Sequence, residues 1–277
     1  MIVHLIDGTY ELFRHFYGIR RFKKTDPPFG AVSGVLTTVA QLLDDGGTHV
    51  GVATDHIIES FRNALWPGYK TGAGIEPALR AQFEPLEESL VAMGVTVWPM
   101  VELEADDALA SAAYLAAQDE RVEKVCIWTP DKDLGQCVSD DRVVQIDRRS
   151  GAIRNAAAVR AKFGVDPRFI PDYLALVGDS ADGYPGISGC GPKTAAQLIN
   201  RHGPLEEFPP NVLNEENRPL ALLFKQLAIL RTDAPLFEDV DELRWQGATS
   251  EFDAVAEKIE NQRLLAKVRK LESQTSG

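Results

Sequence analysis

Short apolar runs alternate with stretches of helical periodicity over residues 1–164 of the chain. Strand-like runs rich in β-branched residues occupy positions 2–6, 50–54, 95–98, 124–129 and 142–146. Helical spacing of apolar residues fills positions 29–43, the stretch that ends at 93, and positions 105–117. Alternation of this kind predicts an α/β fold, with a mainly parallel central sheet and helices on both of its faces. We therefore expect residues 1–164 to form one α/β domain.

The pattern changes after Gly164. Asp166 and Pro167 open a series of short helical stretches punctuated by Gly and Pro, and the strand-like runs stop. This change predicts a helical C-terminal domain over residues 165–271. The polar residues 272–277 are expected to form a disordered tail.

Carboxylates follow several of the predicted strands. Asp7, Asp55 and Asp131 each come at the end of a different apolar run. Ligands of parallel sheets bind beyond the carboxyl ends of the strands, so these three acids are expected to meet at one edge. The full set of acids that end an apolar run or lie in a short turn motif is Asp7, Asp55, Glu104, Asp106, Asp107, Asp131, Asp133, Asp179 and Asp182.

Residues 104–107 place three acids within four positions at the start of the Ala-rich helix. Acids there complement the helix dipole, but one or two would suffice. Two carboxylates about 4 Å apart repel each other by roughly 4 kcal/mol at an effective dielectric constant of 20. A cluster this dense therefore needs cations or protons. The oxygen ligands and the scattered positions of the five histidines favour Mg²⁺ or Mn²⁺ over Zn²⁺.

A glycine-rich segment follows the last two acids of the set. Residues 186–194 read Gly-Ile-Ser-Gly-Cys-Gly-Pro-Lys-Thr and lead into a predicted helix. The glycines permit close backbone approach, and the free N–H groups at the start of the helix can bind phosphate. Such a hairpin can bind the phosphate backbone of a nucleic acid independently of the base sequence. An acid cluster together with a phosphate-binding segment predicts a metal-dependent nuclease.

The formal net charge of −12 argues at first against nucleic acid as a partner. Nine of the 41 acidic residues lie in the expected cluster, however, where divalent cations would offset them. Basic residues gather at 20–24, around Lys193 and Arg201, and at 263–270. No apolar stretch approaches the roughly 20 residues of a membrane span, and the N-terminus lacks the features of a secretory signal. Three cysteines without metal-site spacing suit a reducing compartment, so we expect a cytoplasmic protein. Nothing in the sequence suggests more than a monomer.

Several motifs together give the chain a specific resemblance. They are residues 5–8, Phe61-Arg62, Tyr69-Lys70, residues 79–82, residues 104–107, residues 131–133, residues 173–180, the glycine hairpin, and residues 227–233. With these motifs the chain resembles the bacterial 5'-nuclease family, the flap endonuclease or 5'-3' exonuclease domain found at the N-terminus of DNA polymerase I and as stand-alone proteins. The resemblance implies a PIN-like core, a helical arch over about residues 66–93, and a helix-hairpin-helix motif over about residues 183–202.

The resemblance also implies roles for individual residues. Asp7, Asp55, Glu104 and Asp106 would hold one Mg²⁺ ion, and Asp106, Asp131, Asp133 and Asp182 another, with Asp107 and Asp179 supporting them through water; Mn²⁺ would substitute, and K⁺ would bind at the helix-hairpin-helix motif. The implied catalytic residues are Lys70, Arg62 and Asp106. The implied DNA-binding residues are Phe13, Arg14, Arg62, Lys70, Arg80, Gly189, Gly191, Lys193 and Thr194.

One segment departs from the family pattern. After Lys70, where relatives usually supply another Arg, residues 71–75 read Thr-Gly-Ala-Gly-Ile. Two glycines weaken a helix by roughly 1 kcal/mol each, so the arch is expected to be less rigid and less basic. The expected function is cleavage of DNA at 5' flaps, nicks or primer ends by two-metal catalysis. Two alternatives stay open: a structure-specific DNA-binding protein with little or no catalysis, and a nuclease that acts mainly on RNA.

Overall fold

The fold was obtained as a computed structural model, which describes residues 1–20 and 27–275. A six-stranded sheet forms its centre, with the order β3-β2-β1-β4-β5-β6. The strands are β1 (Ile2–Asp7), β2 (His49–Asp55), β3 (Thr96–Met100), β4 (Lys124–Trp128), β5 (Val143–Asp147) and β6 (Ala152–Arg154). All neighbouring pairs are parallel except β5 and β6. The predicted α/β class and the mainly parallel sheet are therefore confirmed.

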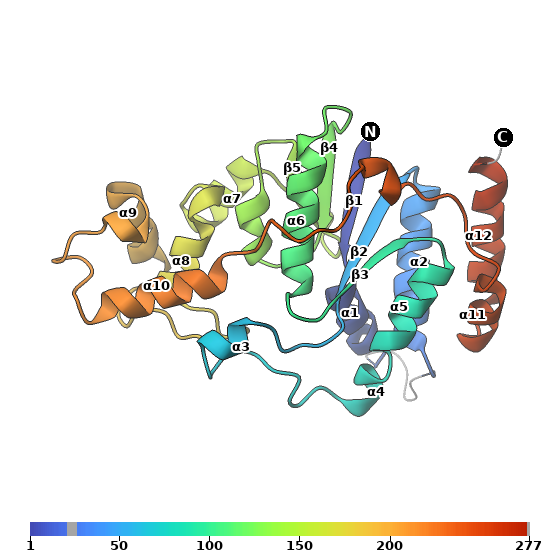
Figure 1. Ribbon diagram of the computed structural model, residues 1–277, viewed down its shortest axis with the longest axis horizontal. Coiled ribbons are helices and arrows are strands. Elements are labelled where there is room, and N and C mark those ends of the chain that lie inside the picture. The colour runs from blue at the N-terminus through green and yellow to red at the C-terminus, as the bar shows by residue number, and fades with distance from the viewer. Residues whose placement is uncertain (21–26, 276–277) are drawn as a thin grey trace.

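Helices cover both faces of the sheet (Figure 1). On one face, Ile6 and Val52 contribute to a core with α1 (Gly8–Arg20), α2 (Gly30–Asp44) and α5 (Phe83–Ala92). On the other face, Val3, Leu5 and Ile127 pack with α6 (Ala105–Gln118). This division follows from strand geometry, because successive side chains point to opposite faces.

A second apolar core lies beyond β6, at the end of the molecule opposite to α12 (Figure 1). It is built from α7 (Ala156–Phe163), η2 (Pro167–Phe169), α8 (Ile170–Val177), α9 (Pro192–His202), η3 (Leu205–Glu207) and α10 (Asn217–Ala228). The hairpin that joins α8 to α9 carries the glycine-rich sequence. The helical character expected after Gly164 is thus present in this region.

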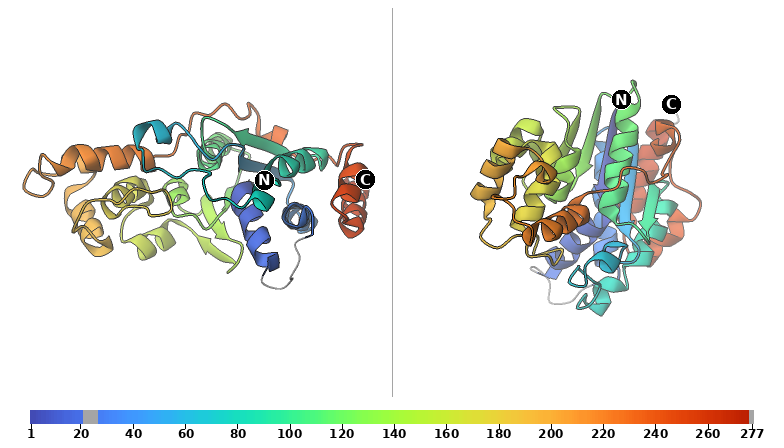
Figure 2. Two further views of the ribbon diagram at one scale, coloured as in Figure 1. Left: turned by 90° about the horizontal axis from the view of Figure 1, so that it is seen from below. Right: turned by 60° about the vertical axis from the view of Figure 1, so that its left-hand side comes forward.

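The expected boundary at residue 271 needs correction. After α10 the chain returns to the sheet through η4 (Val240–Leu243) and ends in α11 (Phe252–Lys258) and α12 (Gln262–Thr275). Phe252, Leu264 and Val268 join the core of α2 and α5 instead of the second core. Figure 2 shows α9 and α10 at one end of the molecule and α12 at the other. Residues 272–275, expected in a disordered tail, continue α12, and residues 276–277 lie outside the described part.

The expected helical arch is only partly helical. Residues 66–76 contain no helix, and the helices that follow are the short α4 (Pro77–Arg80) and α5. Leu86 and Leu90 of α5 are buried in the first core, so α5 belongs to the body of the protein. Apolar spacing alone could not separate an open segment from a helix packed on the sheet. No helix in residues 1–20 and 27–275 is long and apolar enough to cross a membrane.

Candidate active site

Acids from three neighbouring strands meet at the carboxyl edge of the sheet. Asp7 ends β1, Asp55 ends β2, and Asp131 lies three residues after β4, which pairs with β1. Asp7 is close enough to both other acids for their charges to raise its pKa. The predicted meeting of these acids at one edge is therefore confirmed.

The N-terminus of α6 points into the same region. Glu104 is the N-cap residue, and it forms a capping box with Asp107 in which each side chain accepts a hydrogen bond from the other's backbone N–H. Ala105 N–H donates to Asp55 Oδ1 at 2.8 Å, which ties the helix start to the end of β2. The helix dipole and these bonds explain why a sequence rich in acids begins a helix here.

Arg62, the C-terminal neighbour of Phe61 at the start of the short α3 (Arg62–Leu65), neutralises two of these acids. Its guanidinium donates to both oxygens of Asp107 at 2.7 Å and to Glu104 Oε1 at 3.1 Å. It also donates to the carbonyl groups of Leu227 and Ile229. The side chain of Arg62 is 1% exposed, so all of this takes place away from solvent.

Two expectations change as a result. Arg62 was expected to bind DNA and to act in catalysis, but its hydrogen bonds and its burial leave it no access to a substrate. Asp107 was expected at the metal site, where it would support the ions through water. Its oxygens already accept from Arg62, from Glu104 N–H and from Arg231 N–H, so we assign it a structural role. We call Glu104 and Asp107 the paired acids.

Lys70 supplies the second cation of the cluster. Its Nζ lies 2.7 Å from Glu104 Oε2 and 3.1 Å from Asp182 Oδ1. Backbone contacts place it there, since Lys70 N–H donates to the Asp182 carbonyl and the Trp66 indole donates to the Gly183 carbonyl, both at 3.0 Å. Gly183 has φ +84°, and a Cβ there would lie 2.0 Å from the Gly68 carbonyl oxygen. Only glycine permits this close approach, which brings Lys70 to the acids.

The unpaired acids, Asp7, Asp106 and Asp133, form no ion pair within the described ranges. Burial and nearby carboxylates raise the pKa of Asp7 to about 7, against hydrogen bonds from Tyr10 N–H and Thr129 Oγ1. Burial followed by the charge of Asp131 raises the pKa of Asp106 and of Asp133 well above the ordinary value. In contrast, Arg62 and Lys70 outweigh burial at Glu104 and lower its pKa. Without a bound cation, burial and mutual repulsion therefore favour the protonated form of these three acids.

The residues present fit a divalent cation. Ligand oxygens of Asp133, Asp179 and Asp182 all lie within 4.8 Å of one another. Asp133 Oδ1 is buried and has no hydrogen-bond partner, although a buried carboxylate oxygen normally has one. The neighbouring Asp179 is ion-paired with Lys132. An all-oxygen donor set with an unpaired buried oxygen suits a hard cation such as Mg²⁺ or Mn²⁺.

The glycine hairpin, which follows Asp179 and Asp182 in the chain, presents an open backbone. Nothing lies within 4 Å of a Cβ built on Gly189 or Gly191, and Lys193 and Thr194 are exposed in the first turn of α9. Free N–H groups at this helix start and one Lys are suited to phosphate. Their DNA-binding role stays a prediction.

The other expected DNA contacts are more varied. Phe13 is half-buried, with its ring 6.1 Å from that of Phe83. Arg14 is ion-paired with Glu11, at 2.5 Å, whereas Arg80 is exposed on α4. The basic run expected at 20–24 falls almost wholly outside the described residues.

The basic residues of α12 lie far from the acid cluster. Lys267 pairs with Asp44, and Arg269 pairs with Asp253. Two cations of this run are therefore ion-paired within the protein.

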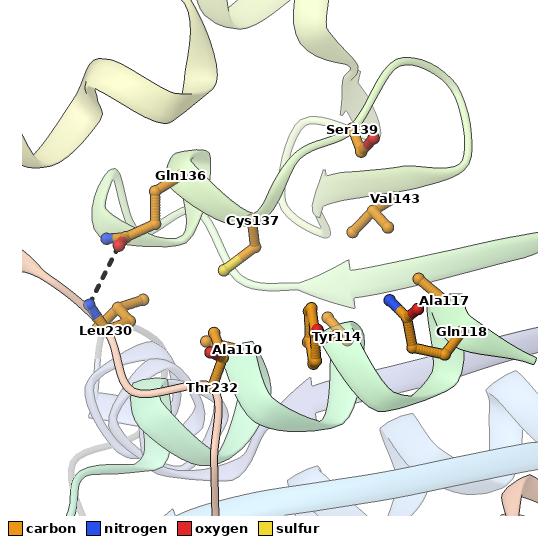
Figure 3. A pocket seen from close by; sticks show the side chains of 11 residues that line it. Ala110, Tyr114, Ala117, Gln118, Gln136, Cys137, Ser139, Val143, Leu230 and Thr232 are labelled. Carbon is orange, nitrogen blue, oxygen red and sulfur yellow. Dashed lines mark hydrogen bonds between the residues drawn. The ribbon is translucent and has the colours of Figure 1, made fainter.

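A cavity of about 300 Å³ lies beside α6 and β5 (Figure 3). Tyr114, Cys137 and Leu230 are among its lining residues, and none of the lining residues is acidic or basic. Gln136 Oε1 accepts from Leu230 N–H across its rim. No residue pattern predicted this cavity, and its lining offers no charged group for chemistry on phosphate.

Sequence reasoning missed several groups that hold the acids. Ser60 Oγ donates to Glu104 Oε1 at 2.6 Å, and Thr129 Oγ1 donates to Asp7 Oδ2 at 2.9 Å. Tyr184, two residues after Asp182, was also not singled out, although it is almost fully buried beside the acids. The short spacing of Thr129 and Tyr184 from predicted ligands was the only signal available.

Comparison with known proteins agrees with this geometry. A family model described as "5'-3' exonuclease, N-terminal resolvase-like domain" matches residues 2–164. A second, "5'-3' exonuclease, C-terminal SAM fold", matches residues 165–251. The 5'-3' exonuclease of Aquifex aeolicus is 33% identical over 213 residues, which cover 76% of this chain and 72% of that protein.

The DNA polymerase I of Pseudomonas aeruginosa is 34% identical over 259 residues, which cover 86% of this chain. The chain thus spans only 28% of the length of that relative.

Two solved structures share the fold. The T5 D15 protein co-crystallised with metal ions has a TM-score of 0.65 and 19% identity, with complete coverage of both chains. The catalytic core of Rad2 in complex with DNA substrate has a TM-score of 0.62 and 14% identity, and covers 97% of this chain and 92% of its own.

Proposed function

Because the chain belongs to the 5'-3' exonuclease family, we propose that it is a metal-dependent, structure-specific 5' nuclease that hydrolyses DNA phosphodiester bonds. The observation that carries the proposal is the convergence of acids around the unpartnered, buried Asp133 Oδ1. A non-catalytic binder would gain nothing from buried carboxylates that repel phosphate. Since the chain spans 28% of the polymerase I relative, the proposal extends only to the nuclease reaction.

In the proposed site, two sets of acids hold two divalent cations. Asp7, Asp55, Glu104 and Asp106 form the first set, and Asp106, Asp131, Asp133 and Asp182 form the second. Asp179 supports the second set through water. Bound cations would activate a water and stabilise the leaving oxygen of an in-line displacement at phosphorus. Mg²⁺ is the proposed ion, with Mn²⁺ as a substitute.

The protein's own groups would hold the substrate. Lys70 Nζ lies at the acid cluster with 29% of its side chain exposed, so it can exchange a carboxylate for the phosphate to be cut. The hairpin backbone at Gly189 and Gly191, with Lys193 and Thr194, would bind the phosphates of a duplex without reading its sequence. K⁺ at this hairpin belongs to the same proposal.

The proposed substrates are 5' flaps, nicks, gaps and primer ends of a duplex, including RNA-primed ones. Residues 66–76 form an open segment beside the acids, and Lys70 is their only basic residue. A single strand that passes this segment would meet less positive charge than a basic helical arch offers. We therefore expect threading to contribute less to the rate than duplex binding does. Action as a monomer in the cytoplasm stays a prediction.

A 5'-labelled double-flap DNA provides the test, incubated with Mg²⁺, with Mn²⁺ or with EDTA. We expect either metal to release a short 5' fragment, and Asp131→Ala and Asp182→Ala to abolish the release. Glu120→Ala removes an exposed acid in the turn just after α6 and is the matched control, with activity unchanged. Tight binding without cutting in either metal would instead support a structure-specific DNA-binding protein.

The RNA alternative needs its own arm of the experiment. Free single-stranded RNA of the same length as the flap strand is incubated under the same conditions. Faster cleavage of this RNA than of the flapped duplex would indicate an RNA nuclease. We expect the reverse, because the hairpin is suited to a duplex.

A further inference from the structure

Tyr184 carries a buried hydroxyl group that has no hydrogen-bond partner. The residue is 1% exposed. Its hydroxyl oxygen, Asp133 Oδ1 and Gln145 Oε1 are the buried side-chain polar atoms without a partner in residues 1–20 and 27–275. Leaving a buried donor unpaired costs about 1–3 kcal/mol. Phenylalanine would fill the same space without this cost, so the hydroxyl group calls for an explanation.

The backbone and the ring of Tyr184 are firmly held. Its N–H and carbonyl group exchange hydrogen bonds of 3.0 and 2.8 Å with Asp179. Its ring stacks on that of Phe224 in α10, with 5.4 Å between centroids and 28° between planes. Phe224 also meets the ring of Trp66 edge-on at 5.2 Å. The hydroxyl group therefore has little freedom to find a partner elsewhere.

The hydroxyl group lies next to the acids of the second proposed metal set. Burial, and then the charges of Asp133, Asp179 and Asp182, raise the pKa of Tyr184. A tyrosine hydroxyl group is neutral at physiological pH, with one proton to donate and lone pairs to accept. The same three acids are the ones whose oxygens lie within 4.8 Å of one another.

Two unpartnered buried atoms thus belong to one site, Asp133 Oδ1 and the Tyr184 hydroxyl oxygen. A cation can satisfy the first. A water molecule bound to that cation has protons to donate, and the oxygen of a neutral phenol can accept a hydrogen bond from it. Mg²⁺ keeps several water ligands in protein sites, so such water is to be expected.

We propose that Tyr184 is a positioning residue whose hydroxyl group accepts a hydrogen bond from a water ligand of the second proposed cation, at Asp133 and Asp182. The inference rests on the proposed function and deepens it. Groups that orient metal ligands in this way typically change metal affinity by 10–100-fold when they are removed. Tyr184 acts through the water and does not touch the substrate.

The test compares wild-type protein with Tyr184→Phe, which removes only the oxygen atom. Mn²⁺ binding is measured by calorimetry without DNA, and the water ligands of bound Mn²⁺ are counted by water-proton relaxation. We expect about tenfold weaker Mn²⁺ binding and altered water relaxation in Tyr184→Phe. With flap DNA, the variant should need more Mg²⁺ for half-maximal cleavage and should approach the wild-type rate at saturation.

Tyr173→Phe is the matched control. Tyr173 is a buried phenol of the same apolar core, on α8, and none of the acids acts on its pKa. Its variant should bind Mn²⁺ as the wild type does.

Two outcomes would overturn the inference. If wild type binds Mn²⁺ and cleaves DNA while Tyr184→Phe matches it in affinity and in water relaxation, the inference fails and the proposed function stands. If wild type neither binds Mn²⁺ nor cleaves, the proposed function fails and the inference fails with it.

Discussion

The paired acids and the unpaired acids lie in one cluster but have opposite electrostatic surroundings. Glu104 and Asp107 are almost fully buried and share the guanidinium of Arg62, and Lys70 lies 2.7 Å from Glu104. Asp7 and Asp133 are also buried, but no ion pair in the described ranges reaches them or Asp106. The pKa of Glu104 is lowered, whereas the pKa values of Asp7, Asp106 and Asp133 are raised.

The difference separates two uses of the same chemical group. A buried carboxylate that is ion-paired with an Arg or Lys side chain stabilises the fold, because removing its partner would leave an uncompensated charge. A buried carboxylate without one destabilises the fold until a proton or a metal ion arrives. The protein can therefore keep a high density of negative charge ready for metal ions only beside a set of acids that is already neutralised.

The largest expected effect is the contrast between substitutions of two adjacent acids, Asp106 and Asp107. Asp106→Asn should lower the cleavage rate about 10³-fold or more, since it removes a carboxylate shared by both proposed metal sets. It should also keep or raise the melting temperature in EDTA, because a neutral amide replaces a repelled charge. Asp107→Asn should lower the melting temperature in the same buffer. An equal decrease in melting temperature for both variants would contradict the distinction between paired and unpaired acids.

Removal of the Arg62 guanidinium should have a nearly equally large effect on the stability of the fold. Arg62→Met leaves Glu104 and Asp107 buried without compensation, and breaking such a pair costs about 3–5 kcal/mol. Urea unfolding monitored by tryptophan fluorescence measures this loss. Arg121→Met is the control. Arg121 forms ion pairs with three acids, but at the surface, so its loss should change the urea midpoint of unfolding little. A small effect of Arg62→Met would contradict the structural role assigned to it.

The pH dependence of stability offers a third test. The pKa of Asp7 is raised in the folded protein to about 7, so the protonated form is favoured by folding. Its contribution to stability is present below the unfolded-state pKa of about 4 and is lost as the pH rises toward about 7. The melting temperature in EDTA should thus fall, relative to that in Mg²⁺, between pH 5.5 and pH 8.

If the free energy of unfolding in EDTA falls by ~2 kcal/mol over this pH range, the gap between the melting temperatures in EDTA and in Mg²⁺ should widen by roughly 4–8 °C. Asp133→Asn removes one unpaired acid and should narrow the gap. A gap that stays constant over this pH range would show that the unpaired acids bear no excess protons.

The smallest expected effect concerns Lys70, which bridges a paired acid and a proposed metal ligand. Lys70→Gln removes a positive charge that competes with metal ions for Glu104 and Asp182. Mn²⁺ affinity measured by calorimetry should rise by about tenfold, equivalent to ~1.4 kcal/mol, while cleavage slows. Lys193→Gln removes a charge of the hairpin and should leave Mn²⁺ affinity unchanged. Weaker Mn²⁺ binding by Lys70→Gln would mean that Lys70 supports the metal site.

Much of the framework could be predicted from sequence because its signals are local. Apolar runs of strand length and helical spacing located the parallel sheet and α6, and the acids at the ends of β1, β2 and β4 were expected at one edge. The limits of local patterns appear in residues 66–93. Glycine and proline signals there did not reveal that α5 packs on the core and that residues 66–76 are open.

The sequence by itself determined which acids reach the edge of the sheet, because short-range periodicity locates the strands and ligands of parallel sheets bind beyond the carboxyl ends of those strands. Only the tertiary structure decided which of them are neutralised. Arg62 meets Asp107 across 45 positions and the Leu227 carbonyl across 165, and Tyr184, in the loop after α8, packs against Phe224 of α10. Burial and charge compensation depend on such distant contacts, and no local pattern of residue types encodes them.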